Sequence, residues 1–70
     1  MVIKEGLTYK HRSWDYNRLL TVLHITQDVA TVSIWDGVDG ASYQTQYMVA
    51  GFIDGWWYEV IDFDKELSYL

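Results

Sequence analysis

Short stretches of alternating apolar and polar side chains run through this sequence, separated by glycines at positions 6, 37, 40, 51 and 55. Val, Ile, Thr, Tyr and Trp are abundant in these stretches, and such residues favour β-strands. The pattern predicts strands over residues 7–12, 19–26, 29–35, 42–50 and 56–63. Turns are expected at Asp36–Gly40 and Asp54–Gly55.

The hairpin across residues 19–35 is the most sharply defined of these elements. With Gln27 and Asp28 as the two central turn residues, alternating side chains sort onto two faces. The pairs predicted on the core side are Leu23 with Val32, Ile25 with Ala30, and Thr21 with Ile34. The other face is predicted to carry Leu20, Val22 and Trp35. A loop longer than Gln-Asp would shift this register.

Helical spacing offers a second interpretation of the first half of this hairpin. The residues at positions i, i+3, i+4 and i+7 of a helix would be Tyr16, Leu19, Leu20 and Leu23, with Ser13 as N-cap. The β-branched residues between positions 21 and 26 favour a strand, which is the interpretation adopted. A short closing helical turn is predicted at the C-terminus, where Phe63, Leu67 and Leu70 share one helical face.

Five short strands in one chain predict a single all-β domain over residues 1–70. Closure into a small barrel would remove the exposed strand edges that invite aggregation. The order of features resembles the SH3-like barrels of the Tudor and KOW type. The residues that carry the resemblance are Gly6-Leu7-Thr8-Tyr9, Leu23-His24-Ile25, and Ala30-Thr31-Val32 leading to Asp36-Gly37. This resemblance spans residues 6–61 and implies a five-stranded SH3-like barrel that binds peptides or nucleic acid.

Composition narrows the class of protein further. Seventy residues leave room for one core, and half of them are hydrophobic. The absence of cysteine excludes disulfides and thiolate metal sites. Charged residues near the N-terminus argue against a signal peptide, and no apolar run reaches the length of a membrane span. We therefore expect a cytoplasmic protein with no membrane association.

Residues that could support catalysis or metal binding do not form a recognisable pattern. His11, His24 and Asp15 lack the spacing of a zinc site. The Asp36–Gly40 segment lacks the alternating oxygen ligands of an EF-hand and is interpreted as a turn. No nucleophile stands in a known catalytic motif. We expect a protein that is not an enzyme and needs no cofactor or metal.

The four tryptophans are the strongest functional signal in the sequence. Trp56 and Trp57 are adjacent on a predicted strand and so point to opposite faces. The predicted binding surface is an exposed apolar patch with an acidic rim, consisting of Leu20, Val22, Trp35 and Trp57 with Asp36, Asp39, Asp54 and Asp62. In the alternative, residues 13–18 with Trp14 and Tyr16, or the C-terminal helical turn, cover this patch as a second small core.

The charge distribution separates three functional hypotheses. The net charge is −5, with a basic N-terminal segment and an acidic remainder. The leading hypothesis is a non-catalytic protein-binding module that uses the Trp-rich face and can also form a homodimer. The first alternative is a small acidic phage-type inhibitor of a nucleic-acid enzyme, a DNA mimic or anti-CRISPR-like protein. The second is a nucleic-acid-binding barrel using Lys4, Lys10, Arg12 and Arg18, which the net charge opposes.

Overall fold

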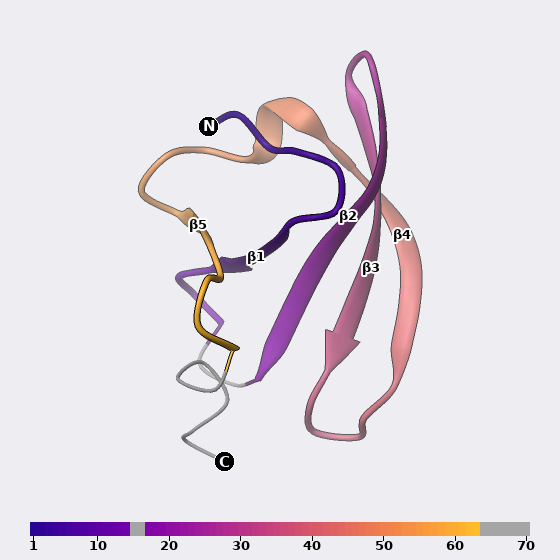
Figure 1. The fold of residues 1–70 in the computed structure, drawn as a ribbon, viewed down its shortest axis with the longest axis vertical. Coiled ribbons are helices and arrows are strands. Elements are labelled where there is room, and N and C mark those ends of the chain that lie inside the picture. The colour runs from indigo at the N-terminus through magenta and orange to yellow at the C-terminus, as the bar shows by residue number, and fades with distance from the viewer. Residues whose placement is uncertain (15–16, 64–70) are drawn as a thin grey trace.

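The computed structural model describes residues 1–14 and 17–63, which form one antiparallel sheet of five strands. The strands are β1 (Thr8–His11), β2 (Arg18–Thr26), β3 (Val29–Asp36), β4 (Ser42–Met48) and β5 (Trp57–Glu59), and a 3₁₀ turn, η1 (Val49–Gly51), follows β4. The strand order is β4-β3-β2-β1-β5 (Figure 1). The predicted all-β class and the five strands are confirmed.

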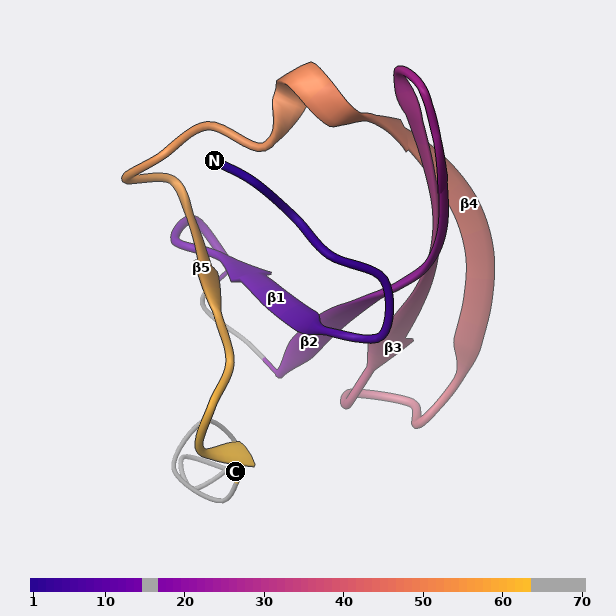
Figure 2. The same cartoon turned by 45° about the horizontal axis from the view of Figure 1, so that its top comes forward.

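The sheet is curved but is not closed into a barrel. β4 and β5 form its two edges in the described residues, so the predicted closure is wrong. Figure 2 shows the sheet bending from β4 to β5, with the N-terminal segment lying between these two edges. β2 pairs with β3 and β3 pairs with β4, so these three strands form two successive hairpins between neighbours in the chain.

The predicted hairpin is present, and its turn is correctly placed at Gln27 and Asp28. Thr26 lies opposite Val29, and Ile25 lies opposite Ala30, as expected. Gln27 adopts φ 42°, in the left-handed region that non-glycine residues seldom occupy. Residues 18–26 form a strand, so the helical alternative is excluded.

A β-bulge between Val22 and His24 changes the register along the rest of the hairpin. On the side of the bulge away from the turn, Val22 lies opposite Val32 and Leu20 lies opposite Ile34. Both pairs are shifted by one residue from the predicted pairing. One extra residue inverts the alternation of side chains between the two faces. Leu20 and Val22 are therefore fully buried, whereas Leu23 is 43% exposed. The predicted faces of this half of β2 are wrong for that reason.

The core lies on the concave side of the sheet. Its buried side chains come from all strands except β4 and from flanking segments, and they include Ile3, Tyr9, Leu20, Val22, Ala30, Val32, Ile34, Phe52 and Trp57. Tyr47 of β4 packs against this cluster. The predicted C-terminal helical turn with Leu67 and Leu70 lies outside the described residues. Within residues 1–14 and 17–63, no helix has the length and apolar composition to cross a bilayer.

Candidate functional site

The structure places three of the four residues of the predicted apolar patch in the buried core cluster. Leu20 and Val22 are buried because of the bulge, and Trp57 is only 8% exposed. Trp35 is half-buried. The prediction that these side chains form one exposed patch is therefore wrong. The exposed indole is instead that of Trp56, the neighbour of Trp57 in the chain, which is 56% exposed.

Trp57 is fixed from several sides by other rings. Its centroid lies 4.7 Å from that of Phe52, 5.3 Å from that of Trp14 and 6.0 Å from that of Tyr47. Trp14 meets it edge to face, at an interplanar angle of 81°. Trp14 thus packs against the main core cluster, which includes Trp57, and not on a separate second core as in the alternative prediction. Tyr16, the other aromatic residue of that alternative, lies outside the described residues.

His11 connects this buried cluster with the surface. Its imidazole meets Trp57 nearly edge to face, with centroids 4.9 Å apart. The same imidazole stacks on Trp56, with an interplanar angle of 13° and centroids 5.8 Å apart. Trp56 is therefore an exposed indole held parallel to a second ring that rests on the core.

Backbone and side-chain hydrogen bonds hold the two stacked residues in place. The Arg12 backbone N–H donates to the Trp56 carbonyl at 2.8 Å, and Arg12 Nη1 donates to the Gly55 carbonyl at 3.0 Å. The Ser13 backbone N–H donates to His11 Nδ1 at 3.1 Å. In this last contact Nδ1 is the acceptor.

An open hollow lies beside the stacked rings. It has a volume of about 560 Å³ and is lined by Arg12, Ser13, Gly55 and Trp56. We call these four residues together with His11 the His11–Trp56 surface. It offers one aromatic face, one guanidinium and one hydroxyl group, and the Ser13 hydroxyl oxygen lies 2.7 Å from His11 Nδ1. This combination suits recognition of a partner.

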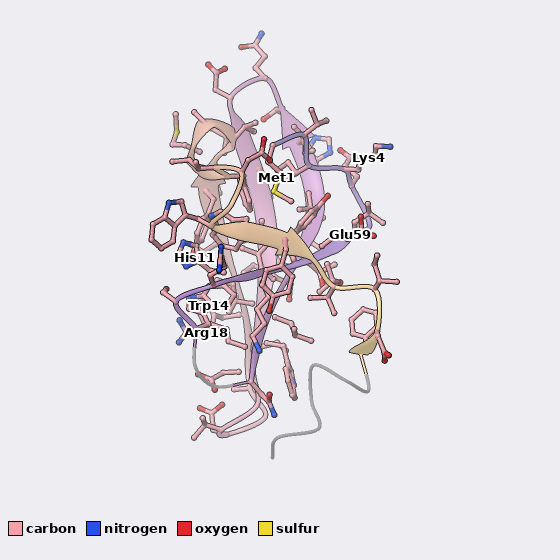
Figure 3. All side chains as sticks on the ribbon, turned by 90° about the vertical axis from the view of Figure 1, so that its left-hand side faces the viewer. Met1, Lys4, His11, Trp14, Arg18 and Glu59 are labelled. Carbon is pink, nitrogen blue, oxygen red and sulfur yellow. The ribbon has the colours of Figure 1, made fainter. Side chains whose placement is uncertain are left out.

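Only part of the predicted basic group lies near this surface. Arg18 has its Cζ 5.5 Å from the centroid of Trp14, and its Nη2 lies 3.5 Å from Asp36 Oδ2. Figure 3 shows His11, Trp14 and Arg18 along one side of the molecule and Lys4 away from them. Lys10 is 3% exposed, so the prediction that it contributes to a basic surface is wrong. Among the described residues, Arg12 and Arg18 supply positive charge to this side, and Arg18 is paired with Asp36.

The predicted acidic rim is not gathered around the tryptophans. Asp36 and Asp39 lie at the β3–β4 turn, where their carboxylates accept hydrogen bonds from the Val38 and Ala41 backbone amides, each at 2.9 Å. This turn lies at the lower end of Figure 1, whereas residues 49–56, which include Asp54, cross the upper half. Asp54 lies 3.6 Å from the N-terminal amine. Asp62 is exposed beyond β5.

The two histidines lie in different settings. His24 Nδ1 lies 3.1 Å from Glu5 Oε2, and both side chains are largely exposed. His11 belongs to the aromatic stack described above. In the described part of the chain, no three histidine, aspartate or glutamate side chains come together as metal ligands.

Sequence reasoning recognised that one of the adjacent tryptophans must be exposed but chose Trp57 as the outward one. The alternation alone does not say which residue faces the core. One feature of the sequence favours Trp56 as the exposed residue. It follows Gly55 directly at the turn, before the chain enters β5.

Comparisons with known protein families, with curated proteins and with solved structures find no match to this chain.

Proposed function

We propose that the protein is a non-catalytic protein-binding module that uses its His11–Trp56 surface. The observation that carries this proposal is the geometry of Trp56, whose indole is 56% exposed yet stacked on His11. A large aromatic side chain that is already ordered loses little conformational freedom on binding, so more of its buried area contributes to affinity. Trp and Arg are also the residue types that most often dominate binding energy at interfaces.

The neighbouring cation indicates what the partner carries. Arg12 uses one guanidinium N–H for the Gly55 carbonyl, and the planar group has further donors. Those donors match a carboxylate, whereas the Trp56 face matches an apolar or aromatic side chain. The proposed partner is therefore an extended protein segment with an apolar or aromatic residue next to an Asp or Glu.

We also propose that the sheet is of the SH3-like type suggested by the sequence resemblance. The support is the continuous antiparallel order from β4 through β3, β2 and β1 to β5, in which the last strand returns to the first. The curvature seen in Figure 2 brings the two sheet edges to face each other across the core. In this proposal the sheet stays open between β4 and β5.

The two other hypotheses have weaker support. A nucleic-acid mimic needs carboxylates gathered on one surface, but Asp36 and Asp39 cap turn amides far from Asp54. Direct nucleic-acid binding needs exposed cations, but Lys10 is buried and Arg18 is partly neutralised by Asp36. The salt titration described below gives a distinct outcome for direct nucleic-acid binding.

The test starts from a library of random peptides displayed on particles and selected against the full chain. We expect enrichment of peptides that place an aromatic or large apolar residue beside Asp or Glu. Titration of a selected peptide should show at least a tenfold loss of affinity for Trp56→Ala and a smaller loss for Arg12→Ala. Val38→Ala is the matched control, because Val38 is an exposed apolar residue on the distant β3–β4 turn.

Salt dependence separates the classes of partner. Docking on Trp56 with one Arg12–carboxylate contact should weaken only modestly as salt rises. Binding of an oligothymidylate with a steep salt dependence would replace the proposal by nucleic-acid binding. Selected peptides that bind Trp56→Ala as tightly as the wild type would remove the His11–Trp56 surface from consideration.

A further inference from the structure

In the part of the chain that the structure describes, β4 is an edge strand and has none of the usual devices that prevent edge-to-edge pairing. It pairs with β3 in one continuous register from Ser42 to Met48. The sequence between Asp39 and Asp54 contains no charged residue and no proline. Natural edge strands are commonly protected by charges, prolines, bulges or short length. The outer edge of β4 is therefore suited to pair with another strand.

The hydrogen-bonding pattern shows which residues of β4 face outward. The Asp36 N–H donates to the Ala41 carbonyl, and the Val49 N–H donates to the Asp28 carbonyl, one bond at each end of the β3–β4 pair. In an antiparallel pair, hydrogen-bonded positions alternate with non-hydrogen-bonded ones. Odd-numbered residues of β4 therefore bond to β3. The backbone groups directed to the outer edge belong to Ser42, Gln44, Gln46 and Met48.

The sequence of this edge is symmetric about Thr45. It reads Tyr43-Gln44-Thr45-Gln46-Tyr47, the same in both directions. A palindrome on an edge strand is self-complementary in an antiparallel pair, because a two-fold axis places each residue opposite its own equivalent. We propose that two copies of this protein form a homodimer by antiparallel pairing of β4 with β4, with the two-fold axis at Thr45.

In this register the available backbone groups match. Gln44 lies opposite Gln46 of the second copy, and Ser42 lies opposite Met48 of the second copy. These are the residues whose amides and carbonyls point outward, so each opposed pair exchanges two backbone hydrogen bonds. The two five-stranded sheets then form one continuous sheet across the dimer. A shift by one residue would oppose outward and inward groups and lose this match.

The side chains are also complementary. Tyr43, Thr45 and Tyr47 lie opposite the buried residues Ile34, Val32 and Ala30, so they point to the core side of the sheet. Pairing about Thr45 places Tyr43 against Tyr47 of the second copy as a non-hydrogen-bonded pair, in which side chains approach most closely. Tyr43 is 50% exposed in the single chain and gains this contact. No charged side chain lies on Ser42–Met48, so the paired strands oppose no like charges, although each chain carries a net charge of −5.

The first measurement is the mass of the full chain by sedimentation equilibrium over a concentration series. We expect a reversible dimer, with the amides of Gln44 and Gln46 becoming protected from hydrogen exchange as the dimer forms. A chain that stays monomeric at millimolar concentration overturns the proposal. So does a dimer in which these two amides exchange as fast as in the monomer.

Paired charge variants test the register. The double variant Gln44→Lys with Gln46→Lys puts like charges opposite each other and should weaken the dimer at least tenfold. The corresponding Gln44→Glu with Gln46→Glu variant should behave in the same way. An equimolar mixture of the two should recover a heterodimer, because Lys then opposes Glu at every pair. Failure of the mixture to associate while both variants remain folded would exclude this register.

A matched control places two lysines on β3, the neighbour of the edge strand β4. Thr31→Lys with Ser33→Lys changes the residues opposite Gln46 and Gln44 on β3, on the same face but away from the edge. This variant should dimerise like the wild type. Trp56→Ala should also dimerise normally, which keeps this inference separate from the proposed function. A dimer lost in Trp56→Ala but retained in the Lys double variant would assign self-association to the His11–Trp56 surface instead.

Discussion

Leu20 lies directly opposite Ile34 across the β2–β3 pair, and both side chains are buried. This relationship depends on the β-bulge at Leu23, which places Leu20 on the core side. We predict that Leu20→Ala lowers the free energy of unfolding by about 2–5 kcal/mol, because it leaves a cavity in a packed core. Leu23→Ala should cost less than about 1 kcal/mol. Urea denaturation of both variants measures the difference, and equal losses would contradict the bulged register.

Glu5 stabilises the hairpin between the bulge and the Gln27-Asp28 turn. Its Oε2 accepts a hydrogen bond from the Ile25 backbone N–H at 2.8 Å. We predict that Glu5→Ala destabilises the protein by about 0.5–1.5 kcal/mol and increases hydrogen exchange at the Ile25 amide. Glu5→Gln keeps an acceptor oxygen and should retain most of the protection. An unchanged exchange rate at Ile25 in Glu5→Ala would show that this contact contributes nothing.

Substitution of the two adjacent tryptophans should lower the free energy of unfolding by very different amounts. Trp57 is enclosed by Phe52, Trp14 and Tyr47, so Trp57→Ala should lower the free energy of unfolding by about 3–5 kcal/mol. Trp56→Ala should cost about 1 kcal/mol or less, because more than half of its indole is already exposed. Chemical denaturation followed by far-UV circular dichroism compares the two. A larger loss for Trp56 would place that indole in the core.

Gly37 allows the chain around Asn17 to approach the β3–β4 turn. Its N–H donates to the Asn17 carbonyl at 2.6 Å, and a Cβ at this position would lie 2.8 Å from Asn17 Cβ and from Trp35 Cη2. Gly37→Ala should therefore destabilise the protein by about 1–3 kcal/mol through overpacking.

Gly51 provides the control for that substitution. A Cβ there meets no atom within 4 Å in the described structure, and no positive φ is required. Gly51→Ala should leave stability unchanged or raise it by about 0.4–1 kcal/mol. Thermal unfolding of both variants measures the contrast. Equal melting temperatures for the two variants would argue against a close approach at Gly37.

The strands and the tight turn of the hairpin were predictable from the sequence, because β-branched residues mark the two strands and the polar pair Gln27-Asp28 lies between them. The register of residues 18–22 was not, since a bulge adds a residue without any distinctive amino acid at Leu23. Because of this one extra residue, Leu20 and Val22 lie in the core and not on the predicted outer face.

The candidate site was predictable only in part. Two adjacent tryptophans on a strand require that one be exposed, but the choice between Trp56 and Trp57 depends on which face meets the core. The stacking of His11 on Trp56 depends on the pairing of His11 with Trp57 across β1 and β5, which joins distant parts of the chain. No local pattern predicts such a contact, so the sequence alone does not place His11 in an aromatic stack.

Pairing between β1 and β5 also bears on the order in which the protein folds. Tyr9 lies opposite Glu59, whereas β2, β3 and β4 form two successive hairpins. Contacts that close a long loop are slow to form, because chain entropy is lost before they contribute stability. We expect the β2–β4 hairpins to form in the folding transition state and β5 to dock afterwards. Ile34→Val should then mainly slow refolding, while Trp57→Phe should mainly accelerate unfolding, in stopped-flow experiments.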